Sequence, residues 1–157
     1  MLTKKAVLTL KEVVAVVKKA KRRGQRIVTT NGCFDLLHYG HVCYLTEAKA
    51  LGDLLIVGIN SDASVRRLKG ANRPLNSAQC RAALVAALKP VDYAFVFSSR
   101  TPVPFIKAIQ PDIHVKGGDY SGRLVEQETV ERYGGRVKLL SLVPGLSTTA
   151  LIKRMGK

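Results

Sequence analysis

The sequence has 157 residues, of which 46% are hydrophobic and 24% charged, and this composition excludes a disordered or fibrous chain. The length predicts a single domain over residues 1–157 with a substantial core. With 26 Lys and Arg against 11 Asp and Glu, the formal net charge of +15 favours anionic partners. No apolar run could span a membrane, no signal peptide is evident, and the three cysteines do not suggest a disulfide scaffold, so we expect a cytoplasmic protein without a membrane partner.

The first predicted element is a helix over about residues 9–23. The stretch "TLKE" predicts a capping box, in which the Thr9 hydroxyl accepts from an amide of the first turn while Glu12 reaches back. Apolar residues then recur at helical spacing up to Gly24, where we expect the helix to end. This amphipathic helix is expected to pack on the rest of the domain.

The remainder of the chain alternates between strand and helix patterns. The expected strands cover 26–30, 54–59, 92–97, 112–116 and 136–142. The expected helices cover 40–51, 63–68, 78–88, 102–109, 124–133 and a last segment from 147. This alternation predicts an α/β fold, a Rossmann-like parallel sheet with helices on both faces. Most of the strands are nearly continuous apolar runs, as expected for a sheet covered on both sides.

Ligands bind to such sheets beyond the carboxyl ends of the strands, at the point where the strand order reverses. The segments that follow the strands read "NGCFDLLHYGH", "NSD", "SSRTP", "GGDY" and "PGLSTT". Four of the five are rich in Gly, Ser, Thr, Asn or Asp. We therefore expect the functional site to be built from these segments.

The first of these segments has the features of a phosphate-binding turn. Gly32 can take backbone angles closed to other residues and lets the chain approach a ligand closely. The amides around Cys33 and Phe34 and the start of the next helix offer donors to an anion. His38 and His41 can point to the same side of the helix start, and imidazole nitrogens can donate to phosphoryl oxygens. The sequence contains neither a Walker A motif nor G-x-G-x-x-G.

Two other chemistries compete for this segment. Cys33, His38, His41 and Cys43 lie within eleven residues, which raises the possibility of a zinc site. Cys43 should face away from His41, because two residues correspond to about 200° around a helix. Nucleophilic catalysis through Cys33 has no evident partner base in the sequence. The remaining histidine, His114, lies in an expected strand and is interpreted as structural.

The motifs together resemble a known family. "HYGH" matches the H-x-G-H signature of the nucleotidyltransferase superfamily. With "TNGCFDLLHYGH", "VGINSDASVRRLKGANRPLN", "VKGGDY" and "GLSTTALI" in this order, the chain is similar to the adenylyltransferase domain of enzymes that make ADP-heptose from heptose 1-phosphate and ATP. The similarity runs from about Leu8 to Met155. In many relatives this domain is fused to a ribokinase-like sugar kinase, which these residues do not contain, so a stand-alone form is expected.

The resemblance implies roles for particular residues. It assigns catalysis to His38, His41 and Lys69, with the histidines on the ATP phosphates and the lysine approaching them. It assigns nucleotide binding to Asn31, Gly32, Cys33, Phe34, His38, His41, Asp119, Gly145, Ser147 and Thr148. It assigns substrate binding to Asp35, Asn60, Asp62, Lys69, Arg73 and Arg81. The implied cofactor is Mg²⁺, held by the ATP phosphates near Asp35 and not by a set of protein ligands.

Several of these residues have simpler interpretations that the sequence leaves open. Asp35 is also a natural cap for a turn or helix, and Lys69 and Arg73 also fit solvated loop charges. Arg81 also fits a solvated helix face. Ser147 is also a good N-cap, although capping and phosphate binding both use the free groups at a helix start and are compatible.

The expected reaction is the transfer of AMP from ATP to a sugar 1-phosphate, heptose 1-phosphate in the family resembled, with release of pyrophosphate. One alternative is a cytidylyltransferase acting on glycerol 3-phosphate, although such relatives carry an arginine before their "GISTT"-like motif and "SLVPGLSTT" has none. A second is an FMN adenylyltransferase. An alternative of another class is a basic RNA-binding module, but the sequence has no base-stacking motif, so a nucleic-acid partner is disfavoured. Relatives often form homodimers, for which the amphipathic N-terminal helix offers a surface.

Overall fold

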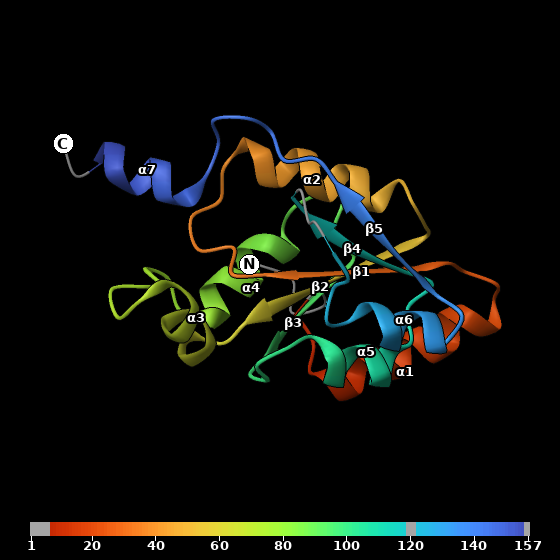
Figure 1. The fold of residues 1–157 in the computed structure, drawn as a ribbon. Coiled ribbons are helices and arrows are strands. Elements are labelled where there is room, and N and C mark those ends of the chain that lie inside the picture. The colour runs from red at the N-terminus through yellow and green to blue at the C-terminus, as the bar shows by residue number, and fades with distance from the viewer. Residues whose placement is uncertain (1–6, 119–121, 156–157) are drawn as a thin grey trace.

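The computed structural model describes residues 7–118 and 122–155, arranged around one sheet (Figure 1). The strands are β1 (Ile27–Gly32), β2 (Leu54–Asn60), β3 (Tyr93–Phe97), β4 (Ile113–Gly117) and β5 (Arg136–Leu140). The helices are α1 (Leu10–Arg22), α2 (Tyr39–Lys49), α3 (Asp62–Lys69), α4 (Ala78–Ala86), α5 (Val103–Ile109), α6 (Gln127–Arg132) and α7 (Thr148–Met155). No described helix is long and apolar enough to cross a membrane.

The strands lie in the order β3-β2-β1-β4-β5, and every pair is parallel. The chain moves outward from β1 to β3 and then returns to the other side of β1 for β4 and β5. The strand order therefore reverses between β1 and β4, which is where the loops leaving neighbouring strands diverge. This arrangement confirms the predicted Rossmann-like parallel sheet.

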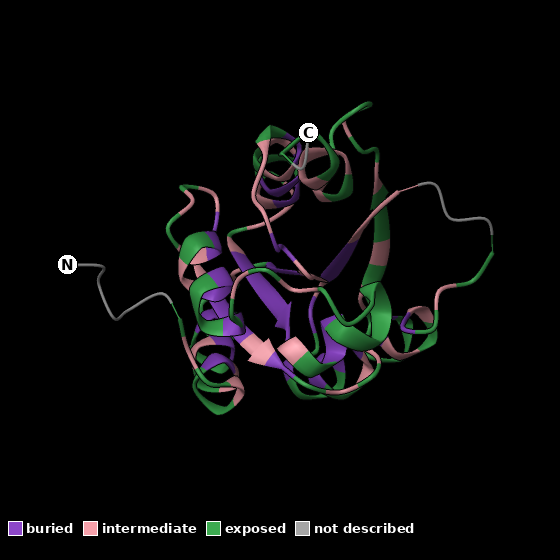
Figure 2. Cartoon of the chain, turned by 90° about the vertical axis from the view of Figure 1, so that its left-hand side faces the viewer, coloured by how far each residue is buried: buried purple, intermediate pink, exposed green. Residues whose placement is uncertain are grey.

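Helices cover both faces of the sheet, and β1 to β4 are mostly buried between them, whereas the edge strand β5 is largely exposed (Figure 2). One core contains Leu45 of α2 and Val85 of α4 against Leu55 and Val57 of β2. The opposite core contains Val17 of α1 together with residues of α5, α6 and the other side of the strands. Apolar residues occupy successive strand positions because each sheet face has its own helical cover.

Helix α1 begins as the sequence predicts. Thr9 Oγ1 accepts from the Glu12 amide at 3.3 Å, and Glu12 Oε2 accepts from the Thr9 amide at 2.7 Å, which completes the capping box. Val13, Val17 and Ala20 are buried against the sheet. The apolar face of α1 is thus used inside the molecule, so it does not support the expected role of this helix as a dimer surface.

Two predicted boundaries are wrong near the C-terminus. The helix expected over 124–133 begins only at Gln127, and the strand expected to reach 142 ends at Leu140. Helix α7 has no buried residue, and Figure 1 shows it projecting beyond the carboxyl ends of the strands. Its first residue, Thr148, donates a hydrogen bond from Oγ1 to the Leu36 carbonyl at 3.0 Å. This contact joins the start of α7 to the loop that follows β1.

Candidate functional site

An open pocket of about 320 Å³ lies at the carboxyl ends of β1 and β4, where the strand order reverses. It brings together residues that are up to 118 positions apart, from Asn31 to Thr149. The predicted site residues that line it are Asn31, Gly32, Cys33, Phe34, Asp35, His38, His41, Lys69, Arg73, Ser147 and Thr148. The sheet topology therefore brings this pocket to the edge where the strand pattern predicts a functional site.

The turn after β1 owes its shape to small residues beside two rings. A Cβ on Gly32 would lie 2.9 Å from the Phe34 ring, and one on Gly40 would lie 3.0 Å from His38 Nδ1. The unusual backbone angle in this turn belongs to Phe34, whose φ is 46°, whereas Gly32 does not need a positive φ. The prediction that Gly32 supplies an unusual backbone angle is therefore wrong. Each glycine instead leaves room for a ring. Gly32 makes room for the ring of Phe34, and Gly40 makes room for the imidazole of His38.

The two histidines of the pocket stack on each other. Their ring centroids are 3.9 Å apart with an interplanar angle of 27°. The His38 amide donates to His41 Nδ1 at 3.3 Å, so a neutral His41 carries its proton on Nε2 and can donate from there. His38 Nδ1 is buried and has no hydrogen-bond partner among the described residues. The pair thus offers imidazole nitrogens to a ligand in the pocket.

Both imidazoles are held in the neutral form. Burial lowers the pKa of His38. Burial and the neighbouring His38 together lower the pKa of His41 to about 4. A bound polyanion would act in the opposite direction, because nearby negative charge favours the protonated form of histidine. The site is therefore able to gain positive charge when an anion binds.

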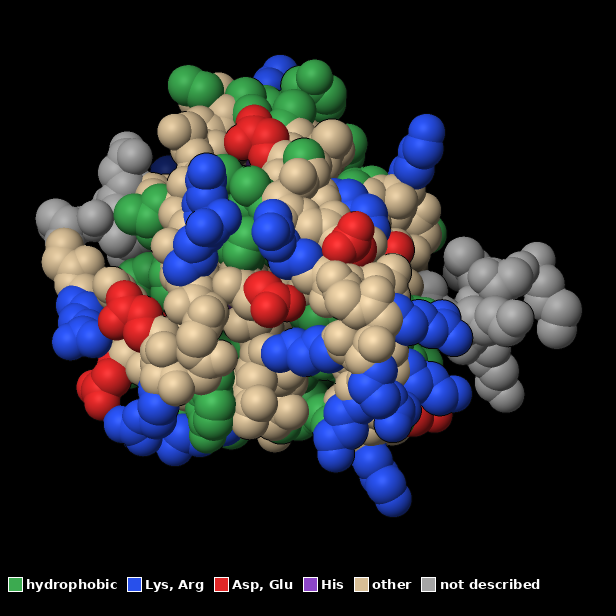
Figure 3. Space-filling view, turned by 90° about the vertical axis from the view of Figure 1, so that its right-hand side faces the viewer, with side chains coloured by type: hydrophobic (Ala, Val, Ile, Leu, Met, Phe, Trp, Pro, Cys, Tyr) green, Lys and Arg blue, Asp and Glu red, His purple; other side chains and the backbone are tan. Residues whose placement is uncertain are grey.

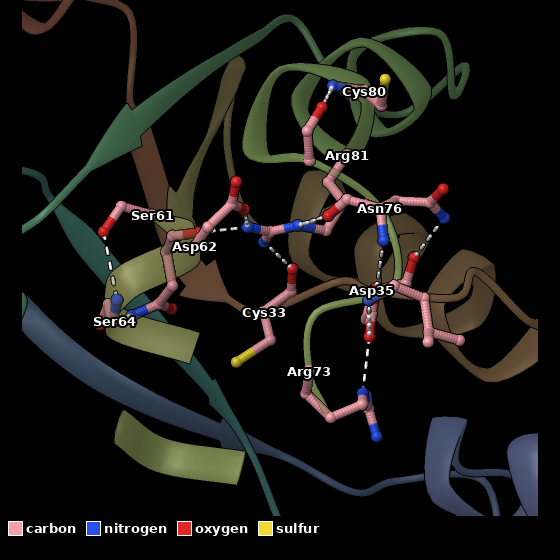
Figure 4. Close-up of polar contacts among 12 residues, drawn as sticks. Cys33, Asp35, Ser61, Asp62, Ser64, Arg73, Asn76, Cys80 and Arg81 are labelled. Carbon is pink, nitrogen blue, oxygen red and sulfur yellow. Dashed lines mark hydrogen bonds and ion pairs between the residues drawn. The ribbon is translucent and has the colours of Figure 1, made fainter. Parts of the chain in front are cut away.

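Asp35 fixes the segment that follows α3 (Figure 4). Its carboxylate accepts from Arg73 Nε at 2.6 Å, from the Leu75 amide at 2.8 Å and from the Asn76 amide at 3.1 Å. Burial alone would raise the pKa of Asp35, but these donors outweigh it and lower the pKa. Asp35 is therefore a buried anion that holds Arg73 in place.

Arg73 keeps its terminal guanidinium nitrogens turned away from Asp35, because the ion pair uses Nε. Arg73 and Lys69, the last residue of α3, both line the pocket. Two cations from the same segment thus face the stacked histidines and the turn after β1. Asp35 holds Arg73, so Arg73 is not a free loop charge. Lys69 is exposed, and the solvated interpretation of its charge stays open.

Arg81 lies neither on a solvated helix face nor in the lining of the pocket, the two places that the sequence suggests for it. Its side chain is fully buried, so the solvated helix face is wrong, and it does not line the pocket. Its guanidinium donates to the carbonyls of Cys33, Asn60 and Asn76 and to Asp62 Oδ1 (Figure 4). One side chain of α4 therefore ties together the loops after β1 and β2 and the segment before α4.

Three further predicted residues stand apart from the pocket, and a fourth lies outside the described residues. Asn60 is buried and donates from Nδ2 to Ser64 Oγ at 3.1 Å, and Asp62 pairs with Arg81. Gly145 has φ 75° and does not line the pocket. Asp119 lies outside the described residues. Asn60 and Asp62 thus support the loop after β2, and their predicted contact with substrate has no geometric basis in this structure.

Seven further residues line the pocket: Gly40, Tyr44, Gly117, Leu142, Val143, Leu146 and Thr149. Gly40, Gly117, Leu146 and Thr149 belong to the motifs, whereas Tyr44, Leu142 and Val143 lie outside them. Tyr44 lies one helical turn after His41, a spacing that could have identified it. The apolar residues just before the "STT" motif come from an irregular segment whose path no periodicity specifies. Together with Tyr44, these residues form an apolar wall of the pocket.

The start of α7 completes the pocket. Ser147 Oγ accepts from the Ala150 amide at 3.0 Å, which is the geometry of an N-cap. Ser147, Thr148 and Thr149 all line the pocket. The free amides of a helix start carry partial positive charge and bind anions. The N-cap interpretation is therefore correct, and it remains compatible with binding a phosphate.

Thiol and metal chemistry receive little support from these residues. Burial raises the pKa of the Cys33 thiol, which disfavours the thiolate that a nucleophile requires. Among the described residues no group of three or more His, Cys, Asp and Glu could hold a metal ion. Asp35 lines the pocket, but its oxygens already accept the bonds from Arg73, Leu75 and Asn76. The part of the chain that the structure describes thus forms no ready site for a resident metal.

Much of the positive charge lies away from the pocket. Figure 3 shows the face at the amino ends of the strands, over which Lys and Arg side chains are spread, with a dense group at its lower right. The exposed cations at the end of α1 and the start of β1 are Lys18, Lys19, Lys21, Arg22, Arg23 and Arg26. A need to bind small anions in the pocket therefore explains only part of the excess of Lys and Arg.

Comparisons with known proteins agree with this geometry. The family described as cytidylyltransferase-like matches residues 29–154. "Bifunctional protein HldE" of Geotalea uraniireducens is 55% identical over 93% of this chain and 30% of its own length, and that of Nitratiruptor sp. is 50% identical over 98% and 32%. The chain thus spans about a third of the length of these curated relatives.

Two solved structures share the fold. The lipopolysaccharide core biosynthesis protein of Thermoplasma volcanium has 32% sequence identity and a TM-score of 0.65, over 76% of this chain and 98% of that one. The pantoate-beta-alanine ligase of Francisella tularensis has 14% identity and a TM-score of 0.56, over 95% of this chain and 72% of that one. The second likeness concerns the fold alone.

Replacing Arg81 with Met is expected to destabilise the protein by about 2–4 kcal/mol, because buried carbonyls and Asp62 lose their donor. Urea unfolding measures this loss. Arg66→Met, which removes an exposed arginine of α3, serves as the control and should change the free energy of unfolding by less than about 0.5 kcal/mol. Equal stability of the two variants would contradict the proposed clamp.

Acidification from pH 7 to pH 5 is expected to lower the stability of the protein. The pKa of His41 is about 4 in the folded state against its ordinary value of 6.5, so the unfolded state binds more protons between these values. Thermal unfolding across this range measures the slope. His38 and His114 contribute with the same sign, so His41→Gln should flatten the dependence without abolishing it. An unchanged slope in that variant would show that His41 is not held neutral.

Proposed function

Because the chain belongs to the cytidylyltransferase-like family of nucleotidyltransferases, we propose that it transfers AMP from ATP to a sugar 1-phosphate, with heptose 1-phosphate as the acceptor. The products are ADP-heptose and pyrophosphate. The observation that carries this proposal is one pocket lined by the H-x-G-H histidines, two cations of the segment after α3 and the start of α7. These groups come from distant parts of the sequence and all suit phosphoryl oxygens.

The reaction needs no protein nucleophile. An oxygen of the sugar phosphate attacks the α-phosphorus of ATP, and the bond to the pyrophosphate oxygen breaks. The second pKa of a phosphate monoester is about 6, so the attacking phosphate is largely ionised at neutral pH and needs no general base. Catalysis then consists of positioning two mutually repelling anions and of stabilising the charge on the transferred phosphoryl group.

The residues of the pocket divide this work. His38 and His41 donate to the phosphates. The negative charge of the bound phosphates next to the imidazoles favours their protonation and so counteracts the lowered pKa of His41. Lys69 and Arg73, which line the same pocket, bring positive charge to the phosphates, and Asp35 sets the direction of Arg73. The free amides at the start of α7 hold the departing pyrophosphate. Mg²⁺ enters bound to ATP as part of the substrate and neutralises phosphate charge.

The acceptor is supported by the relatives and by one sequence feature. The HldE proteins are named as bifunctional, and the Thermoplasma volcanium protein is named for lipopolysaccharide core biosynthesis, a process that consumes activated sugars. The segment before "STT" lacks the arginine that marks the glycerol 3-phosphate branch. We place the activity in the cytoplasm, where ATP is available. A homodimer remains a prediction without structural support.

Pyrophosphate release with Mg²⁺ tests the function directly. ATP and CTP are each combined with heptose 1-phosphate, glycerol 3-phosphate and FMN. We expect release only from ATP with heptose 1-phosphate. Release from CTP with glycerol 3-phosphate, or from ATP with FMN, would keep the phosphate site but overturn the acceptor. No release from any pair, together with salt-sensitive RNA binding, would favour the basic RNA-binding alternative.

His41→Ala is expected to lower kcat by about 100-fold or more, the loss typical of one donor to a charge that develops in the transition state. Steady-state pyrophosphate release at saturating substrates measures this effect. The control is Thr46→Ala on the same helix, where an exposed hydroxyl donates only to the Val42 carbonyl. An unchanged kcat in His41→Ala would remove His41 from the catalytic group.

A further inference from the structure

A ladder of polar side chains crosses from β1 to β4 behind the pocket. Thr29 and His114 are partners in the strand register, and Thr29 Oγ1 lies 2.8 Å from His114 Nδ1. Two residues further along each strand, Lys116 Nζ lies 3.4 Å from Asn31 Oδ1. Alternate residues of a strand point to the same side of the sheet, so both pairs lie on one face. The second pair reaches the rim of the pocket, because Asn31 lines it.

Glu126, in the segment that precedes α6, contacts both β4 residues of this ladder, His114 and Lys116. It is only 1% exposed, and its Oε1 lies 3.0 Å from Lys116 Nζ and 3.7 Å from His114 Nε2. The 3.0 Å contact falls outside hydrogen-bond geometry and is an ion pair. Burial raises the pKa of Glu126, but His114 and Lys116 outweigh it and lower the pKa to about 2. Glu126 is therefore a buried carboxylate that holds the Lys116 ammonium.

This ion pair determines how the amide of Asn31 is turned. An ammonium group only donates, so Asn31 must present its Oδ1 oxygen to Lys116. The NH₂ group of the amide then faces away from Lys116. Among the described residues it donates to no protein acceptor, although Asn31 lines the pocket. The amide thus presents a donor where a ligand binds.

We propose that Lys116, held by Glu126, is a positioning residue that fixes the Asn31 amide so that its Nδ2 donates to an oxygen of the bound nucleotide. The identity of the nucleotide as ATP rests on the proposed function. Without Lys116 the amide can rotate by half a turn, and its oxygen would then meet the negatively charged ligand. Lys116 therefore acts on nucleotide binding through Asn31 and not by touching the ligand.

A double-mutant cycle on Lys116→Met and Asn31→Ala tests this inference, with the KM for ATP measured at saturating sugar phosphate. We expect each single variant to raise KM about 5- to 20-fold, the loss of one hydrogen bond to a charged group, with a smaller change in kcat. The double variant should be no worse than the poorer single variant, because both changes remove the same bond. Effects that multiply would overturn the inference.

Lys138→Met is the matched control, because Lys138 is an exposed lysine of the neighbouring strand β5 and the chemical change is identical. Its KM for ATP should equal that of the wild type. Glu126→Gln should raise KM in the same direction as Lys116→Met, and it replaces that variant in the cycle if thermal unfolding shows that Lys116→Met does not fold. An active wild type with an unchanged KM in Lys116→Met would overturn this inference alone. A wild type that neither binds nor turns over ATP would overturn the proposed function as well.

Discussion

The buried guanidinium of Arg81 is the contact on which the shape of the pocket depends. It lies on α4, yet its acceptors are carbonyls at Cys33, Asn60 and Asn76 and the carboxylate of Asp62. The loops that leave the neighbouring strands β1 and β2 meet at the carboxyl edge of the sheet, and their backbone carbonyls would otherwise be buried without donors. A planar group with donors at fixed angles joins them in a single arrangement. Asp35 then extends this scaffold to Arg73, so this cation of the pocket rests on buried polar contacts.

The pocket combines neutral and charged donors in a way that suits an anionic ligand. The guanidinium of Arg73 is always charged and Asp35 holds it in place, whereas the stacked His38 and His41 are neutral in the unliganded site. Two protonated imidazoles at 3.9 Å would repel each other in the absence of phosphate. The histidines can therefore adjust their charge to the ligand, while the guanidinium and the helix start provide a fixed positive potential.

Much of this arrangement could be predicted from the sequence. The parts that could not be predicted share one cause, which is that they depend on contacts between distant segments. The alternation of apolar strands and helices predicts the parallel sheet, and the H-x-G-H and "STT" segments follow strands that end at the same edge. Their convergence is thus a consequence of topology. The role of Arg81 could not be predicted, because its burial depends on loops that are distant in sequence. The positive φ of Phe34 is similarly hidden, since a bulky residue rarely adopts it, and neither periodicity nor composition marks the apolar wall around Leu142.

The contact between Asp35 and Arg73 has a consequence for how the family can vary. Asp35 belongs to the turn after β1, and Arg73 to a segment that lies 38 residues further along the chain. A chain that kept the aspartate and lost the arginine would retain a buried carboxylate held by amides alone. A chain that kept the arginine and lost the aspartate would retain a cation with no fixed direction. Positions 35 and 73 are therefore one unit of evolutionary change, and in homologous chains they should be exchanged together or not at all.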